Sequence, residues 1–160
     1  MSSSNTVYDV IILGGGPAGL QASLGLSRVR RPNLVISIPD VRRNIAADKM
    51  HSVLTLDGTP PSEFISTAKE EILRYGFASF ENGKAVSAKK IDENFLVTLE
   101  NGKSFTGRKL VFATGSRDIF PNIEGKFPDS QPFSKIIVKR VCNVLGNENC
   151  SLSILPWMGT

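Results

Sequence analysis

The sequence predicts an α/β fold in which a strand–helix–strand unit is followed by a meander of short strands. Three observations carry this prediction. An apolar run leads directly into a glycine-rich turn, a helical segment poor in breakers follows the turn, and later short apolar stretches are separated by Asn-Gly dipeptides. The chain has 160 residues, of which 41% are hydrophobic. This is enough apolar material for the core of one domain.

The first half of the predicted fold is a βαβ unit. Residues 7–13 form a β-branched apolar run, which is typical of a parallel strand buried on both faces. Gly14–Gly19 then turns the chain into a helix expected from Pro17 to Val29, because proline suits the first helical turn. Pro32 ends the helix, and Leu34–Ile38 is expected to form the second strand.

A second helix follows an irregular stretch. Residues 39–58 lack a clear period and end in a cluster of turn-forming residues. Ser62 is placed to cap a helix that runs to Tyr75, and Gly76 stands where such a helix would stop.

Short strands are expected after this helix. Residues 78–108 are predicted to form a β-meander whose hairpin turns are Asn82-Gly83 and Asn101-Gly102, because Asn and Gly accept positive φ at low cost. A further apolar strand over Lys109–Ala113 ends at Thr114-Gly115.

The charge of the chain argues against nucleic acid as a partner. The formal net charge is +4, and the basic residues are interspersed with acidic ones over most of the chain. The one local cluster, Arg28, Arg30 and Arg31, is better explained as cations at a helix C-terminus than as a polyanion site.

Membrane insertion, secretion and a disulfide scaffold are not expected either. No run approaches the roughly 18 apolar residues of a membrane span. Met1–Thr6 is polar and lacks the order of a secretory signal, so a cytoplasmic protein is expected. Cys142 and Cys150 are too few for a disulfide framework and have no zinc-like spacing, so no metal site is predicted.

The motif with the clearest chemistry is the glycine turn. Gly-x-Gly-x-x-Gly is a weak signal by itself, but here it follows a buried strand and opens a helix, which is the context of a Rossmann-like dinucleotide site. The first glycine allows the tight turn, the second lets the backbone approach a pyrophosphate, and the third lets helix and strand pack closely. Free N–H groups at the helix start would bind the phosphates. The candidate binding residues are Gly14, Gly15, Gly16, Pro17, Ala18 and Gly19.

Two further positions are candidates for ligand contact. A ribose needs an acceptor near the end of the second strand, where Ser37 and Asp40 are available. Asp40 is the only acid in range, and it is equally explained as a turn residue after Pro39. His51 is the only histidine; its titration near neutral pH suits a cofactor contact or a proton relay, although a single histidine is more often structural.

Several strings occur together in a characteristic order. They are Tyr8–Ile12 before the glycine motif, Arg43-Asn44, Met50–Thr55, Asp57–Phe64, Arg74–Gly76, Lys109–Gly115 and Pro121–Gly125. In this order the chain resembles the low-molecular-weight thioredoxin reductase-like flavoproteins. Within that family it is most similar to the fungal dithiol oxidases of epidithiodiketopiperazine biosynthesis, the gliotoxin-type enzymes. The resemblance covers about residues 7–125.

This resemblance implies that the glycine motif binds FAD rather than NAD. It also implies that Arg43, Asn44 and His51 lie near FAD, and that Ala113, Thr114 and Gly115 close over it. The family's acid at the end of the second strand is replaced by Ile38 here, with Asp40 two residues further on. The residue that binds the ribose is therefore left open.

The domain organisation of this family includes segments that are not found in this sequence. The reductases carry a second domain with NADPH and a redox Cys-x-x-Cys pair, and then return to complete the FAD site with a Gly-Asp segment. We expect residues 1–125 to be the N-terminal part of an FAD-binding domain, truncated before the NADPH domain. NADPH is expected only for a complete member. Residues 126–160 match no part of this plan, and the codons of Gly125–Phe127 can contain a splice donor. A retained intron, a shifted reading frame or a decayed gene copy would each explain this tail.

The function implied by the resemblance is that of an FAD-dependent oxidoreductase. In the complete enzyme the flavin would pass electrons between a nicotinamide or oxygen and a dithiol or disulfide small molecule, and no residue here is assigned the thiol chemistry. The alternative is an inactive nucleotide-binding remnant or an interaction module that pairs with a full-length relative; a homodimer is also open. A small NAD(P)-binding protein is disfavoured by the meander.

Overall fold

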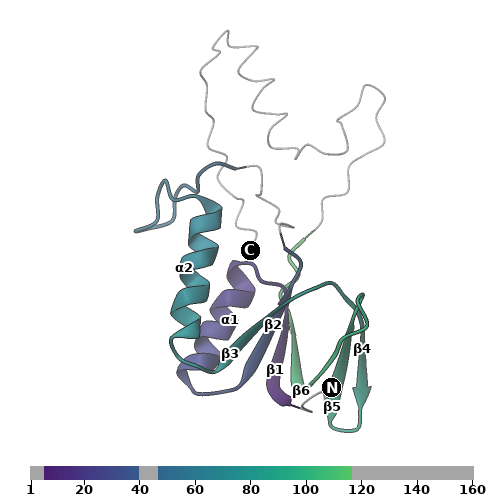
Figure 1. Ribbon diagram of the computed structural model, residues 1–160. Coiled ribbons are helices and arrows are strands. Elements are labelled where there is room, and N and C mark those ends of the chain that lie inside the picture. The colour runs from purple at the N-terminus through teal and green to yellow at the C-terminus, as the bar shows by residue number, and fades with distance from the viewer. Residues whose placement is uncertain (1–5, 40–46, 117–160) are drawn as a thin grey trace, which may run out of the picture. The chain divides into compact units, whose positions relative to one another are not determined.

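The computed structural model describes residues 6–39 and 47–116 (Figure 1). The elements in chain order are β1 (Val7–Leu13), α1 (Pro17–Arg28), β2 (Asn33–Ser37), α2 (Pro61–Leu73), β3 (Ala78–Asn82), β4 (Ala85–Ile91), β5 (Asn94–Leu99) and β6 (Ser104–Phe112). Contacts divide these residues into a sheet unit, residues 6–39 and 65–115, and a loop unit, residues 47–64 with 116. Each unit is described by itself.

The strands of the sheet unit form one six-stranded sheet in the order β3-β2-β1-β6-β5-β4. β1 pairs in parallel with β2 and β6, and β2 pairs in parallel with β3. The other two pairs, β5–β6 and β4–β5, are antiparallel. The sheet is therefore mixed, and the predicted α/β fold with a Rossmann-like βαβ unit is confirmed.

β1 is the central strand, and both of its faces are covered. Because side chains alternate along a strand, Ile11 and Ile12 point to opposite faces, and both are 0% exposed. One face packs Val10, Ile12 and Val35 against a group that includes Ala22 and Leu26 of α1. This two-sided burial explains the unbroken apolar run in the sequence.

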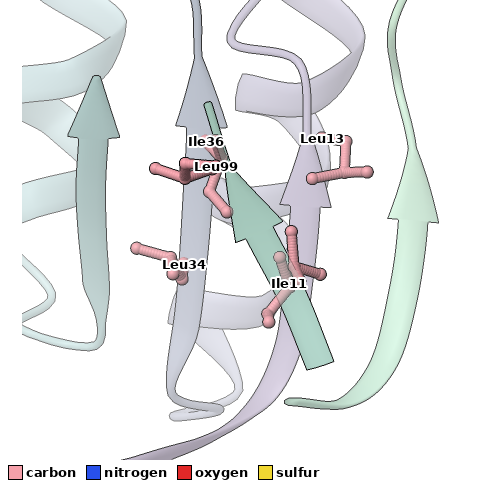
Figure 2. Packing of buried hydrophobic residues seen from close by; sticks show 6 residues of the cluster. Ile11, Leu13, Leu34, Ile36 and Leu99 are labelled. Carbon is pink, nitrogen blue, oxygen red and sulfur yellow. The ribbon is translucent and has the colours of Figure 1, made fainter. Parts of the chain in front are cut away.

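The other face of the parallel strands is covered by the meander. Ile11, Leu13, Leu34 and Ile36 form one buried cluster with Val97 and Leu99 of β5 (Figure 2). In Figure 2 β5 crosses obliquely over this face, and Leu99 lies beside Ile36. The strands of one continuous sheet thus also pack face to face, because the sheet bends back on itself.

The bend occurs in β6, which is longer than predicted. The expected strand Lys109–Ala113 is only the second part of Ser104–Phe112. The first part pairs with β5 and the second with β1, and Gly107 is paired on both sides. A Cβ atom at Gly107 would lie 2.7 Å from Ile11 Cγ1, so a glycine is needed where β6 passes β1.

The prediction that residues 78–108 form a single meander is wrong for its first strand. β3 pairs with β2 at the far edge of the sheet, and Asn82-Gly83 is not a hairpin turn. Instead the Gly83 N–H donates to Ser37 O at 2.9 Å. The meander consists of β4, β5 and β6, and its first turn is at Asp92, which has a φ of 52°. The Asn101-Gly102 turn is confirmed, with a φ of 83° at Gly102.

The second helix, α2, provides the crossover between β2 and β3. Lys69 Nζ lies 5.5 Å from the centre of the Phe80 ring of β3, and Ile72 is 1% exposed. The helix begins at Pro61, so Ser62 lies inside its first turn and the predicted Ser62 cap is wrong. The Gly76 N–H donates to Leu73 O at 3.0 Å, which confirms the predicted stop. No helix in the described part of the chain is long and apolar enough to cross a membrane.

Candidate dinucleotide site

The glycine loop is joined to the carboxyl ends of three parallel strands. The Gly14 N–H donates to Ile36 O at 2.8 Å, and the Ala113 N–H donates to Leu13 O at 2.8 Å. Gly14 has a φ of +116°, and a Cβ atom there would overlap the Ala113 carbonyl oxygen. Only glycine combines this φ with so close an approach, so the predicted tight turn at Gly14 has a direct physical cause.

Two other glycines allow close packing. A Cβ atom at Gly19 would overlap the Gly14 carbonyl oxygen and would lie 3.4 Å from Ala113 Cβ. A Cβ atom at Gly15 would lie 2.7 Å from Ser37 Cβ and 2.9 Å from Ser37 Oγ. The start of α1 is thereby held against its own loop, and the loop is held against the end of β2.

Gly16 has the opposite surroundings. No heavy atom of the described residues would lie within 4 Å of a Cβ atom at Gly16, and its φ of −80° is open to any residue. Gly16 is the N-cap of α1 but offers no side-chain cap, and the first turn of the helix contains no acidic residue. Pro17 and Ala18 are exposed. A helix N-terminus attracts anions through its N–H groups and its dipole, so this open position fits a phosphate.

The predicted residues after the closing strand lie at the same loop. A Cβ atom at Gly14 would overlap the Ala113 carbonyl oxygen, and a Cβ atom at Gly19 would lie 3.4 Å from Ala113 Cβ. The Thr114 nitrogen would be 3.2 Å from a Cβ atom at Gly14. Gly115 has a φ of 70° and is exposed. The structure therefore brings Ala113 and Thr114 to the glycine loop. Their role in closing over a cofactor stays a prediction.

The remaining predicted contacts are not among the described residues of the sheet unit. Asp40, Arg43 and Asn44 lie outside the described residues, as do Cys142, Cys150 and the proposed tail at 126–160. His51 belongs to the loop unit. Within the described residues there is no group of three or more His, Cys, Asp and Glu side chains that could hold a metal ion.

The loop unit holds His51 next to a carboxylate. His51 Nδ1 lies 3.6 Å from Asp57 Oδ1, and the same oxygen accepts the Ser52 N–H at 2.8 Å. The hydrogen bond from the Ser52 backbone is the main cause that holds the pKa of Asp57 below its ordinary value; His51 lowers it further, while desolvation opposes both. Sequence reasoning missed Asp57, although an Asp before Gly in a turn often accepts a nearby backbone N–H.

The Asp57 carboxylate should make this loop sensitive to acid. Because its pKa is lowered in the folded loop, the stabilisation is fully present above the ordinary value of about 3.9 and is lost as the pH falls through the lowered pKa. The Ser52 amide shift in NMR spectra should report this with a midpoint below the ordinary value. D57N should abolish the titration. A midpoint at or above the ordinary value, or a titration that persists in D57N, would contradict the assignment.

Comparison with known proteins places this chain in a family. The model of the pyridine nucleotide-disulphide oxidoreductase family matches residues 8–147. A probable thioredoxin reductase of Arthroderma benhamiae is 38% identical over an alignment of 124 residues, and the alignment covers 74% of this chain and 30% of that protein. Thioredoxin reductase tcpT of Claviceps purpurea is 41% identical over 128 residues, covering 78% of this chain and 39% of the relative.

Solved structures agree with the sequence relatives. The oxidoreductase from Agrobacterium tumefaciens superimposes with a TM-score of 0.69 at 37% identity, over 75% of this chain and 40% of that one. The chain thus spans well under half the length of these relatives. The parallel strands, the packed glycine loop and these matches lead to one conclusion. The chain belongs to the pyridine nucleotide-disulphide oxidoreductase family, as a thioredoxin reductase-like member.

Proposed function

We propose that this chain binds FAD through its glycine loop, as the N-terminal FAD-binding part of a thioredoxin reductase-like flavoprotein. The observation that carries the proposal is the contrast among the glycines. Gly14 and Gly19 have no room for a side chain, whereas Gly16, at the start of α1, faces open space. A dinucleotide site needs this combination of a tightly packed turn and a backbone that a pyrophosphate can approach. Members of the family are FAD- and NADPH-dependent flavoproteins.

Several of the described residues would bind the cofactor or shape its site. Backbone groups at Gly15, Gly16 and Ala18 would bind the phosphates, while Gly14 and Gly19 shape the turn. Pro17 sets the first turn of the helix without an N–H group of its own. The family resemblance supports further contacts from Asp40, Arg43, Asn44, His51, Ala113, Thr114 and Gly115.

Bound FAD would supply the redox chemistry, and the protein would position it. In the complete protein we propose electron transfer between a nicotinamide or oxygen and a dithiol or disulfide small molecule. The sequence has two cysteines, Cys142 and Cys150, which do not form a Cys-x-x-Cys pair. No residue of this chain is therefore assigned the thiol step. A cytoplasmic location is part of the same proposal.

Flavin retention tests the proposal directly. The 160-residue chain is purified, incubated with FAD and passed through a gel filtration column while the visible spectrum is recorded. Flavin absorbance that elutes with the protein is the expected result. A folded chain that elutes without flavin would overturn the proposal and favour an inactive remnant. NADPH-dependent reduction of a disulfide by this chain alone would contradict the conclusion that no residue of this chain carries out the thiol step.

Gly16→Ala separates binding from folding. The variant should still fold, since a Cβ atom there meets no atom of the described residues within 4 Å, although alanine is a poorer N-cap than glycine. Its affinity for FAD, measured by flavin fluorescence titration, should fall by at least about tenfold, or about 1.4 kcal/mol, because the methyl group occupies the space of the approaching pyrophosphate. Gly25→Ala is the matched control, because Gly25 has equally open surroundings further along α1. Equal affinities for the two variants would count against the site.

A further inference from the structure

The loop that carries His51 is closed by its own backbone. The Met50 N–H donates to Thr59 O at 2.8 Å, and the Gly58 N–H donates to Met50 O at 2.7 Å. Inside this loop Ser52 and Thr55 have φ values of 64° and 69°. Left-handed backbone is unfavourable for serine and especially for β-branched threonine, so surrounding interactions must stabilise it.

Asp57 supplies one of these interactions from across the loop. Its Oδ1 accepts the Ser52 N–H at 2.8 Å and lies 3.6 Å from His51 Nδ1. A single oxygen atom thus faces both the left-handed residue and the imidazole beside it. The His51 side chain is 42% exposed, so part of it is accessible to solvent or to a ligand.

We propose that Asp57 is a positioning residue for His51: its carboxylate holds the Nδ1 side of the imidazole and leaves Nε2 as the nitrogen that meets the ligand. The hydrogen-bonding partner of one ring nitrogen decides which tautomer a neutral histidine adopts. A carboxylate beside Nδ1 favours a proton on that nitrogen, so that Nε2 becomes a hydrogen-bond acceptor. This proposal rests on the proposed function, in which His51 contacts the cofactor.

The same geometry links the backbone to the side chain. Because Oδ1 is anchored by the Ser52 N–H, the carboxylate cannot turn away from His51 without breaking that bond. The oxygen that accepts the Ser52 N–H is therefore also the one that lies beside His51 Nδ1. A residue that only stabilised the turn would not affect the histidine tautomer, which gives the proposal a specific readout.

Nitrogen-15 NMR of the full chain without cofactor tests the positioning role. His51 is the only histidine, so its ring signals need no assignment. At a pH where the ring is neutral, the wild type should show an increased share of the Nδ1–H tautomer. Asp57→Ala should lower the ratio of Nδ1–H to Nε2–H by about two- to fivefold, which is the range of an exposed charge pair. Asp57→Asn should lie between the two, because its amide oxygen keeps the Ser52 bond.

Asp48→Ala is the matched control, since Asp48 is an exposed acid of the same unit, and it should leave the tautomer ratio unchanged. A ratio in Asp57→Ala equal to that of the wild type would overturn the proposal. If the Ser52 amide shift shows that Asp57→Ala disrupts the loop, Asp57→Asn decides, and an unchanged ratio there would overturn it equally.

Flavin binding distinguishes this proposal from the function on which it rests. If the wild type retains no flavin, the proposed function fails, while the tautomer ratio still decides the role of Asp57 in the loop. If the wild type binds FAD, Asp57→Ala should weaken binding and Asp48→Ala should not. Equal flavin affinity of these two variants would overturn the ligand-facing part of the proposal.

Discussion

Gly19→Ala is expected to lower the free energy of unfolding by about 2 to 3 kcal/mol, although alanine is the better helix former. The added Cβ atom would overlap the Gly14 carbonyl oxygen, and it would also lie 3.4 Å from Ala113 Cβ. The first of these contacts is with backbone, which cannot rotate away as a flexible side chain would. Relief requires the start of α1 to move away from its own loop, and this movement would also disturb the proposed phosphate site.

Gly25→Ala provides the control within the same helix. Gly25 is exposed, and in the part of the chain that the structure describes no neighbour lies within 4 Å of a Cβ atom there, so alanine should stabilise the chain by about 0.5 to 1 kcal/mol. Urea denaturation of both variants, followed by circular dichroism, gives the comparison. The two substitutions should therefore change stability in opposite directions. A Gly19→Ala variant as stable as Gly25→Ala would contradict the close approach of Gly19 to the Gly14 carbonyl oxygen.

Asn33→Ala is expected to cost about 2 to 4 kcal/mol, because Asn33 is the centre of a buried polar network. Its Oδ1 accepts the Ser23 hydroxyl at 2.6 Å, and its Nδ2 donates to Ser27 Oγ at 3.1 Å. Nδ2 also faces the carbonyl oxygens of Arg31 and Phe77, at 3.0 and 3.3 Å. The side chain thus joins α1, β2 and the residue that precedes β3, and its removal leaves buried polar groups without partners.

A double-mutant cycle with Ser23→Ala tests the network. Ser23 and Asn33 are both 0% exposed and share a hydrogen bond, so their effects should not add. The double variant should be more stable than the sum of the single effects predicts, by about 0.5 kcal/mol or more. Additive effects would contradict coupling between the two side chains. Thermal unfolding of the four chains, with calorimetric enthalpies, supplies the values.

Local patterns were sufficient for the first half of the fold. The limits of β1, α1 and β2 follow within a residue or so from the apolar run, the glycine turn and Pro32. The sequence also identified the glycines that build the loop and the family to which they belong. These features depend on neighbours along the chain, where steric and hydrogen-bonding preferences act directly.

The second half depended on partners distant in sequence. The local sequence of β3 fits two arrangements equally well, because a short apolar strand can be a parallel partner of β2 or the first strand of a meander. The predicted strand Lys109–Ala113 is shorter than β6 because the local sequence does not show that β6 pairs with two different strands at Gly107. That pairing is a property of the assembled sheet. The choice between these arrangements is made by burial of apolar surface and by satisfaction of backbone hydrogen bonds.

The candidate site likewise has features that the sequence predicted and features that only the tertiary structure showed. The sequence by itself determined the glycine turn between β1 and α1, where we propose that phosphates bind, since a glycine pattern between a strand and a helix has few other uses. Only the tertiary structure decided which glycines are packed and which faces open space, and it alone revealed Asp57 beside Ser52 and His51. The physical reason is distance along the chain. Gly14 meets Ala113 only after the sheet has assembled, and residue spacing carries no information about that approach.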